Sequence, residues 1–138
     1  MLKIFQITQG IDQWLQHYGC SFFSVLFLLG MDLTIAEING IYYDGRPKIY
    51  NEKDQLLWIA FAQFLNSKYE THLEYQGWRD RNYVPKEGEK EILHFYISDE
   101  YPDHFVIGDG KGNVAWDPMN NDVAKDSGKL IDKRLFSV

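Results

Sequence analysis

The spacing of apolar residues changes along the chain, and this change limits the folds available to it. Up to about residue 66, apolar residues recur three and four positions apart, which is the spacing of helices with a buried face. From Tyr69 onward, apolar and polar residues tend to alternate, as they do in strands with one buried face. Helices followed by antiparallel strands pack on one face of the resulting sheet. The sequence therefore predicts one α+β domain over residues 1–138.

Local signals define the expected elements. Thr34 and Glu37 have the spacing of a capping box at a helix start, and Asn51 is a suitable cap for a later helix. The segment DGRP (44–47) is typical of a turn, and GDGKGN (108–113) is typical of a hairpin. The expected helices cover residues 11–18, 20–29, 34–43 and 54–66. The expected strands cover residues 70–76, 91–97, 104–109, 113–117 and 133–138, with an exposed loop at 78–90.

Charge and cysteine content narrow the classes of function. The net charge is −6, and the short basic clusters at 79–81 and 129–134 are interrupted by aspartate. A nucleic-acid-binding protein normally has a basic face, so no nucleic-acid partner is expected. Cys20 is the only cysteine, which fits a reducing compartment, and we expect a cytoplasmic protein. The apolar run at 22–31 is much shorter than the ~20 residues of a membrane span, so no membrane contact is expected.

Cys20 opens the apolar segment CSFFSVLFLLG, which is expected to form a buried helix. A cysteine nucleophile reacts as the thiolate, whereas a free thiol has a pKa near 8.5 and is mostly protonated at neutral pH. The positive end of a helix dipole and a neighbouring histidinium both favour the thiolate. Gly19 permits a tight turn and the close approach of a substrate backbone. Cys20 is therefore the candidate nucleophile.

Four histidines compete for the role of base beside that thiol. His17 lies on the preceding segment, His72 has no partner pattern, and His94 alternates with apolar neighbours and is expected to point to solvent. His104 begins a strand and lies near the opposite end of the expected hairpin from Asp117. Side chains at such positions are cross-strand neighbours. Asp117 could then accept from one ring nitrogen and direct the other nitrogen toward the thiol.

Two segments, GCSFFSVLFLLG (19–30) and HFVIGDGKGNVAWDP (104–118), resemble the papain-like cysteine peptidases. The resemblance is strongest to the bacterial double-glycine, bacteriocin-processing type and its small bacterial and phage relatives. It rests on a cysteine at a helix start, a histidine on a strand and an Asp-Pro pair on the next strand. The resemblance implies a papain-like fold in which Cys20 is the nucleophile, His104 the general base and Asp117 the residue that orients the base.

The same resemblance implies an oxyanion hole, formed by the Cys20 backbone N–H and an upstream glutamine side chain. Gln13 and Gln16 lie on either side of the usual spacing, and Gln13 is the preferred candidate. The chain departs from the family at Ser21, where the family has glycine after the cysteine. The double-glycine type cleaves leader peptides, and nothing in this sequence fixes that specificity.

Ordinary structural roles compete with catalysis at these positions. A lone cysteine is more often a small buried hydrophobe than a nucleophile, and Asp-Pro commonly ends a strand. Zinc-binding pairs, an EF-hand and a phosphate-binding glycine loop are absent from the sequence, so no metal or cofactor is expected. Two functions stay open: a hydrolase that acts on a peptide or protein substrate through a Cys-His-Asp triad, and an inactive binding or structural protein on the same scaffold.

Overall fold

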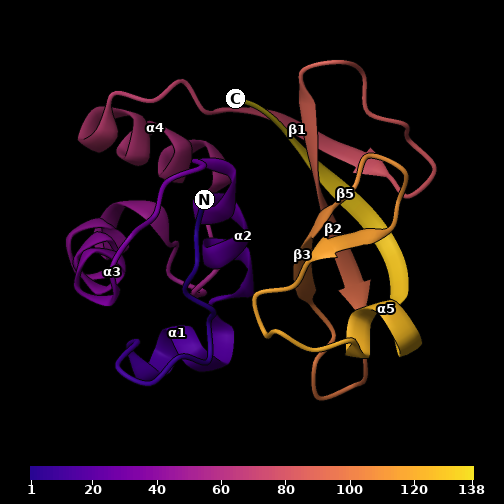
Figure 1. Cartoon of the computed structure of the whole chain (residues 1–138), viewed down its shortest axis with the longest axis horizontal. Coiled ribbons are helices and arrows are strands. Elements are labelled where there is room, and N and C mark those ends of the chain that lie inside the picture. The colour runs from indigo at the N-terminus through magenta and orange to yellow at the C-terminus, as the bar shows by residue number, and fades with distance from the viewer.

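The computed structural model describes residues 1–138 and has a helical half and a sheet half, which lie side by side in Figure 1. The predicted α+β class is confirmed. The helices are α1 (Gln13–Tyr18), α2 (Cys20–Leu28), α3 (Ile35–Ile49), α4 (Trp58–Tyr69) and the short α5 (Val123–Ser127). The strands are β1 (Glu74–Asp80), β2 (Glu89–Tyr96), β3 (His104–Gly108), β4 (Val114–Trp116) and β5 (Lys129–Ser137).

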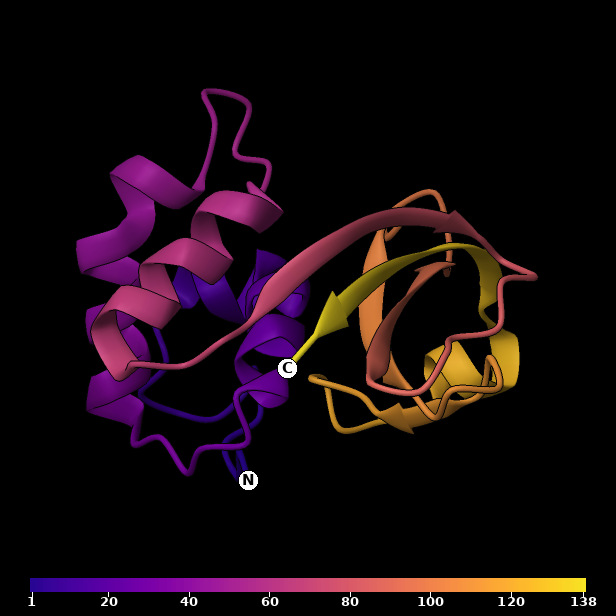
Figure 2. The ribbon, with the colours of Figure 1, turned by 90° about the horizontal axis from the view of Figure 1, so that it is seen from above.

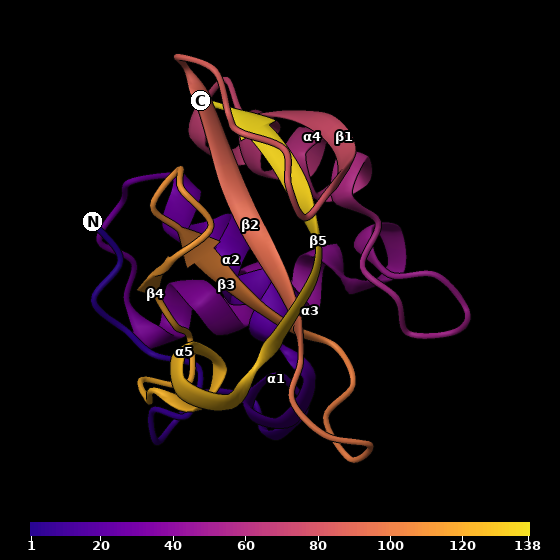
Figure 3. The ribbon, with the colours of Figure 1, turned by 90° about the vertical axis from the view of Figure 1, so that its right-hand side faces the viewer.

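The sheet is antiparallel throughout, with the strand order β1-β5-β2-β3-β4. It is strongly twisted and curves away from the helices, as seen from above in Figure 2. Figure 3 looks onto the sheet, with α2 behind it and α5 in front. The hairpin expected at 108–113 forms and joins β3 to β4. This hairpin forms one edge of the sheet, and its strand β3 packs against α2.

The main core fills the space between the helices and the sheet. Phe22 and Phe23 of α2 are fully buried there, and the Phe22 ring stacks on Phe61 of α4 with centroids 4.9 Å apart. Ile92 and Phe136 belong to the same cluster from the sheet side. Because α2 is covered on nearly all sides, its sequence is apolar around the whole helix, as the sequence predicts.

A second, smaller cluster lies on the other face of the sheet. It contains Leu93, Phe95, Val106 and Ala124, the last from α5. Successive side chains of a strand point to opposite faces. The odd-numbered residues Leu93 and Phe95 of β2 therefore point away from the helices, and the even-numbered residues of β2 point toward them. Both faces of β2 are therefore buried, which explains its long apolar stretch.

Two expectations about the helices are wrong. The segment 44–47 is not a turn, because α3 continues through Pro47 as far as Ile49. Buried Gly45 sits against the Phe64 ring of α4, and this tertiary packing outweighs the local turn preference. Asn51 does not cap α4, which begins at Trp58; its side chain instead accepts backbone N–H groups within the turn between α3 and α4.

Other local predictions are confirmed or extended. Thr34 and Glu37 form the expected capping box at the start of α3. The loop expected at 78–90 is partly strand, because β1 runs to Asp80, and α5 was not expected. No helix is both long enough and apolar enough to cross a membrane.

Candidate active site

Cys20 is the first residue of α2 and follows α1 after a single residue, Gly19. The Gly19 N–H donates to the Leu15 carbonyl at the end of α1, and the Gly19 carbonyl accepts from Phe23 at the start of α2, each at 2.8 Å. A Cβ at Gly19 would lie 2.4 Å from the Leu15 carbonyl oxygen, so the junction has no room for a side chain. The thiol thus lies at the positive end of α2, where backbone N–H groups lack helical partners.

The β3–β4 hairpin positions the other two predicted site residues. His104 is the first residue of β3, and Asp117 directly follows β4. His104 Nε2 lies 2.9 Å from Asp117 Oδ1, which also accepts the Met119 N–H at 2.9 Å. Both side chains are largely buried. The hairpin therefore fixes the orientation of the His104 ring, as the sequence analysis expects of a histidine and an acid at these positions.

The His104 ring is bonded to Asp117, and both Asp117 and Cys20 affect its pKa. Burial by itself would lower the pKa of His104, but hydrogen bonds and charge interactions with Asp117 and Cys20 outweigh burial and raise this pKa to about 10. Since Nε2 binds Asp117, Nδ1 is the ring nitrogen left for the sulfur. The Cys20 thiol donates to the Asp103 carbonyl oxygen, 3.7 Å from Sγ. The structure therefore bonds His104 to Asp117 and bonds Cys20 to the residue that precedes His104.

Ser24 connects α2, the helix of Cys20, to β3, the strand of His104. It lies one turn after Cys20 on α2 and is fully buried. Its Oγ lies 2.8 Å from the Cys20 carbonyl oxygen and 3.2 Å from the Phe105 carbonyl oxygen, and its hydroxyl donates to these acceptors. Phe105 is the neighbour of His104, so this contact sets how α2 and β3 approach each other. Ser24 was not expected to belong to the site, although a serine four residues after the cysteine in an apolar helix is a usable signal.

Three upstream glutamines differ in their surroundings. Gln13 is exposed at the start of α1, and its side-chain amide makes no hydrogen bond. The Gln16 amide donates to two backbone carbonyls of the N-terminal segment, so it is already engaged. Gln6 is buried; its Nε2 donates to the Gln16 carbonyl at 3.0 Å, and its backbone N–H donates to Pro118 at 2.9 Å. Gln6, which the sequence analysis missed, thus connects α1 to the segment that carries Asp117.

His94 does not point to solvent, so that expectation is wrong. Its ring is buried, stacks on Phe105 with centroids 4.5 Å apart, and lies between the carboxylates of Asp103 and Asp132. Alternation does not identify the solvent-facing side chains of β2, because both faces of β2 are buried and His94 is on the face toward the helices. His17 and His72 are exposed.

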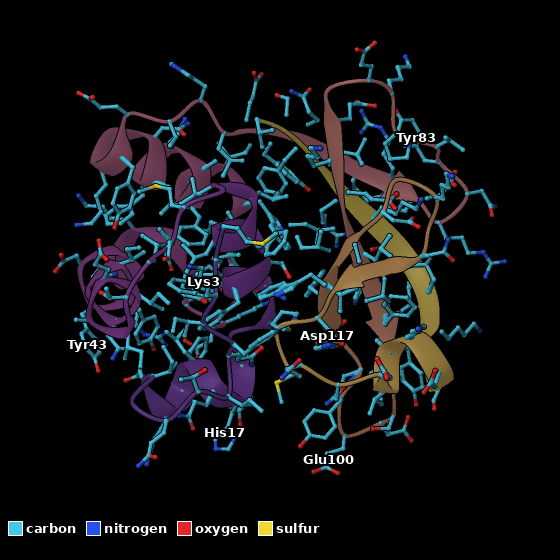
Figure 4. The ribbon with its side chains drawn as sticks, viewed as in Figure 1. Lys3, His17, Tyr43, Tyr83, Glu100 and Asp117 are labelled. Carbon is cyan, nitrogen blue, oxygen red and sulfur yellow. The ribbon has the colours of Figure 1, made fainter.

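The surroundings of the site are closed in the structure. Figure 4 shows Asp117 between the helical half and the sheet, with His17 and Glu100 at the same end of the molecule. Cys20 is only 9% exposed. A surface hollow of about 380 Å³ lies elsewhere, between the end of α2, the start of β2 and the turn that follows β3. Cys20 does not line this hollow.

Comparison with curated proteins and with solved structures gave no match. One family does match, over residues 1–138, and its description reads "Protein of unknown function, DUF261". Since the match covers the whole sequence, the chain belongs to the DUF261 family.

Proposed function

We propose that the protein is a thiol hydrolase of the cysteine peptidase or amidase type, with Cys20, His104 and Asp117 as its triad. The observation that carries the proposal is the position of His104, whose ring binds Asp117 through Nε2 at 2.9 Å, while the Cys20 thiol donates to the carbonyl of the preceding residue, Asp103. A cysteine at a helix start, facing a histidine that an acid orients, is the arrangement that thiol catalysis requires. The helical half packed on an antiparallel sheet also supports a papain-like fold.

The chemistry follows from this arrangement. A His104 ring with a pKa of about 10 is protonated at neutral pH, and an imidazolium beside sulfur stabilises a thiolate. The thiolate of Cys20 attacks the carbonyl carbon of a peptide or amide bond and forms a tetrahedral oxyanion. His104 gives its proton to the leaving amine, and a thioester remains on Cys20. The neutral ring then takes a proton from water, which attacks the thioester and frees the thiol and the acid product.

Asp117 keeps the ring in its catalytic orientation. Its carboxylate accepts the Nε2–H and leaves Nδ1 for the proton exchanged with sulfur and substrate. The N-terminal end of α2 is suited to stabilise an oxyanion, because its first N–H groups point away from the helix. The Cys20 N–H is one proposed donor. The unengaged amide of Gln13 is the proposed second donor, as the papain-like resemblance implies.

The single cysteine allows a direct test. Iodoacetamide should modify Cys20 in the folded protein at pH 6, well below the ordinary thiol pKa near 8.5, and mass spectrometry should locate the adduct. Substituting His104→Gln should move the alkylation midpoint up toward 8.5. Substituting the exposed His72→Gln should leave it unchanged and serves as the matched control. Hydrolysis of a fluorogenic peptide amide should disappear in Cys20→Ser.

A non-catalytic protein on the same scaffold is the competing function. The observation that favours it is the burial of Cys20, which is only 9% exposed. In that case Cys20 would react with iodoacetamide only in denaturant, and His104→Gln would not change its alkylation profile. Those two results together would exclude the hydrolase.

A further inference from the structure

A second group of charged side chains lies directly beside the candidate triad. His94 Nδ1 lies 2.9 Å from Asp132 Oδ1, and His94 Nε2 lies 2.7 Å from Asp103 Oδ1. Arg134 reaches the same Asp132 oxygen at 2.5 Å. These four residues, which we name the His94 cluster, come from β2, β5 and the end of the loop between β2 and β3. No step of the proposed mechanism uses them.

Both ring nitrogens of His94 face a carboxylate oxygen, that of Asp132 at Nδ1 and that of Asp103 at Nε2. Arg134 also contacts the Asp132 carboxylate. His94 and Asp132 are mostly buried, with side chains 10% and 13% exposed, which strengthens the interaction between them.

The two carboxylates are held very differently. Asp132 also receives hydrogen bonds from Trp78 and Arg134, and these bonds hold its pKa below the ordinary value although burial acts in the opposite direction. The Asp103 side chain is 67% exposed and has His94 as its only partner. Asp132 therefore anchors His94 to the sheet, and His94 in turn anchors Asp103.

Asp103 is the residue that joins the cluster to the triad. Its carbonyl oxygen is the acceptor for the Cys20 thiol at 3.7 Å, and the next residue is His104. The loop before it contains backbone hydrogen bonds only at 97–101. The Asp103 side chain makes one hydrogen bond, to His94, and this bond adds to the thiol contact at the Asp103 carbonyl and to the pairing of His104 with Phe95 in the sheet.

We infer that His94 is a positioning residue, which sets the distance between the Cys20 sulfur and the His104 ring by holding Asp103 against the sheet. The inference rests on the proposed function, because it assigns a role in bringing nucleophile and base together. His94 itself is separated from the sulfur by Asp103 and takes part in no bond making. Removing its bond to Asp103 should let residues 102–104 shift and separate the sulfur from the base.

Two substitutions of His94 separate its two bonds. The amide nitrogen of glutamine extends about as far from Cα as Nε2, so His94→Gln keeps a donor for Asp103. The amide nitrogen of asparagine extends only about as far as Nδ1, so His94→Asn keeps the donor for Asp132 and loses the one for Asp103. Asp103→Ala removes the same bond from the exposed end and provides a folded alternative if His94 variants unfold. His72→Asn is the control at an exposed histidine.

The first measurement is the rate of Cys20 alkylation against pH. His94→Asn and Asp103→Ala should each lower the rate at pH 6 by roughly tenfold to a hundredfold, the range for a displaced catalytic group. The double variant should be no slower than either single variant, because both remove one bond. His94→Gln and the His72→Asn control should stay near the wild-type rate.

The second measurement does not depend on reactivity: amide hydrogen exchange over residues 97–105. Exchange should be faster in His94→Asn than in His94→Gln. Unchanged exchange and alkylation in His94→Asn and Asp103→Ala would overturn the inference and leave the proposed function intact. An unreactive wild-type Cys20 would instead overturn the proposed function and the catalytic role of His94 with it, and exchange would still show whether His94 holds Asp103.

Discussion

The β3–β4 hairpin that carries His104 and Asp117 is fastened at its turn by a buried ion pair. Glu91 and Lys133 are 1% and 2% exposed, and Lys133 Nζ lies 2.8 Å from Glu91 Oε1. The other carboxylate oxygen of Glu91 accepts the backbone N–H groups of Gly110 and Gly112 at 2.9 and 3.0 Å. The Lys133 ammonium also donates to the carbonyl of Tyr83, a residue that Figure 4 shows on the sheet side of the molecule.

Removing only Lys133 should be costly. In Lys133→Met the Glu91 carboxylate stays buried with two backbone donors and no counter-charge. Breaking one side of a buried pair typically costs about 3–5 kcal/mol, a large part of the roughly 5–15 kcal/mol of a typical domain. We expect a loss in this range, with a fall in the melting temperature on the order of 10 °C.

Removing both charges should cost less than the two single losses added together. In Glu91→Leu with Lys133→Met no unpaired charge remains, and the N–H groups of Gly110 and Gly112 are only partly buried, so water can reach them. Urea unfolding followed by tryptophan fluorescence gives all four corners of this double-mutant cycle. We expect a coupling energy of about 1–3 kcal/mol. A loss below about 1 kcal/mol in Lys133→Met, or additive single losses, would refute the reasoning.

Three further outcomes follow from the site. Ser24→Ala should lower the unfolding free energy, measured in urea, by about 1 kcal/mol and should slow Cys20 alkylation, because α2 loses its bond to β3. The control Ser21→Ala removes no hydrogen bond and should leave the alkylation rate unchanged. Gly19→Ala should destabilise the protein in thermal melts, since its Cβ would overlap the carbonyl at the end of α1; a melting temperature equal to wild type would contradict this. The folded-state pKa of His104, about 10, lies above its ordinary value of 6.5, so its stabilising contribution is complete below pH 6.5 and is lost as the pH rises toward 10. The stability difference between wild type and His104→Gln should therefore shrink over that pH interval in urea titrations, and a constant difference would contradict the assignment.

Local signals predicted those parts of the fold that depend on neighbouring residues. The capping box of Thr34 and Glu37 and the hairpin at 108–113 need only a few adjacent residues to form, and both are present. The same local reasoning failed at 44–47, where the packing of Gly45 against a distant helix decides the conformation. It also failed at His94, because the faces of a strand buried on both sides cannot be told apart by alternation alone.

The candidate site shows the same division between local and distant information. The pairing of residues 104 and 117 could be predicted from the sequence, because they lie on the two strands of one expected hairpin. Their side chains are hydrogen-bonded as expected. The partners of His94 come from β5 and from the loop before β3, so no sequence spacing indicates them. Gln6 and Ser24 were missed for the same reason, since each acts through a backbone carbonyl far along the chain.

Three hydrogen bonds across the interface show how the site is assembled. Gln6 donates to Pro118, Ser24 donates to Phe105, and the Cys20 thiol donates to Asp103. Each joins the first 24 residues to the β3–β4 hairpin or to the residue on either side of it. Cys20 and the bonded pair of His104 and Asp117 therefore come together only when the N-terminal segment has docked on the completed sheet. Reactivity of Cys20 below pH 7 would for this reason report correct docking of the two halves, in addition to the local environment of one thiol.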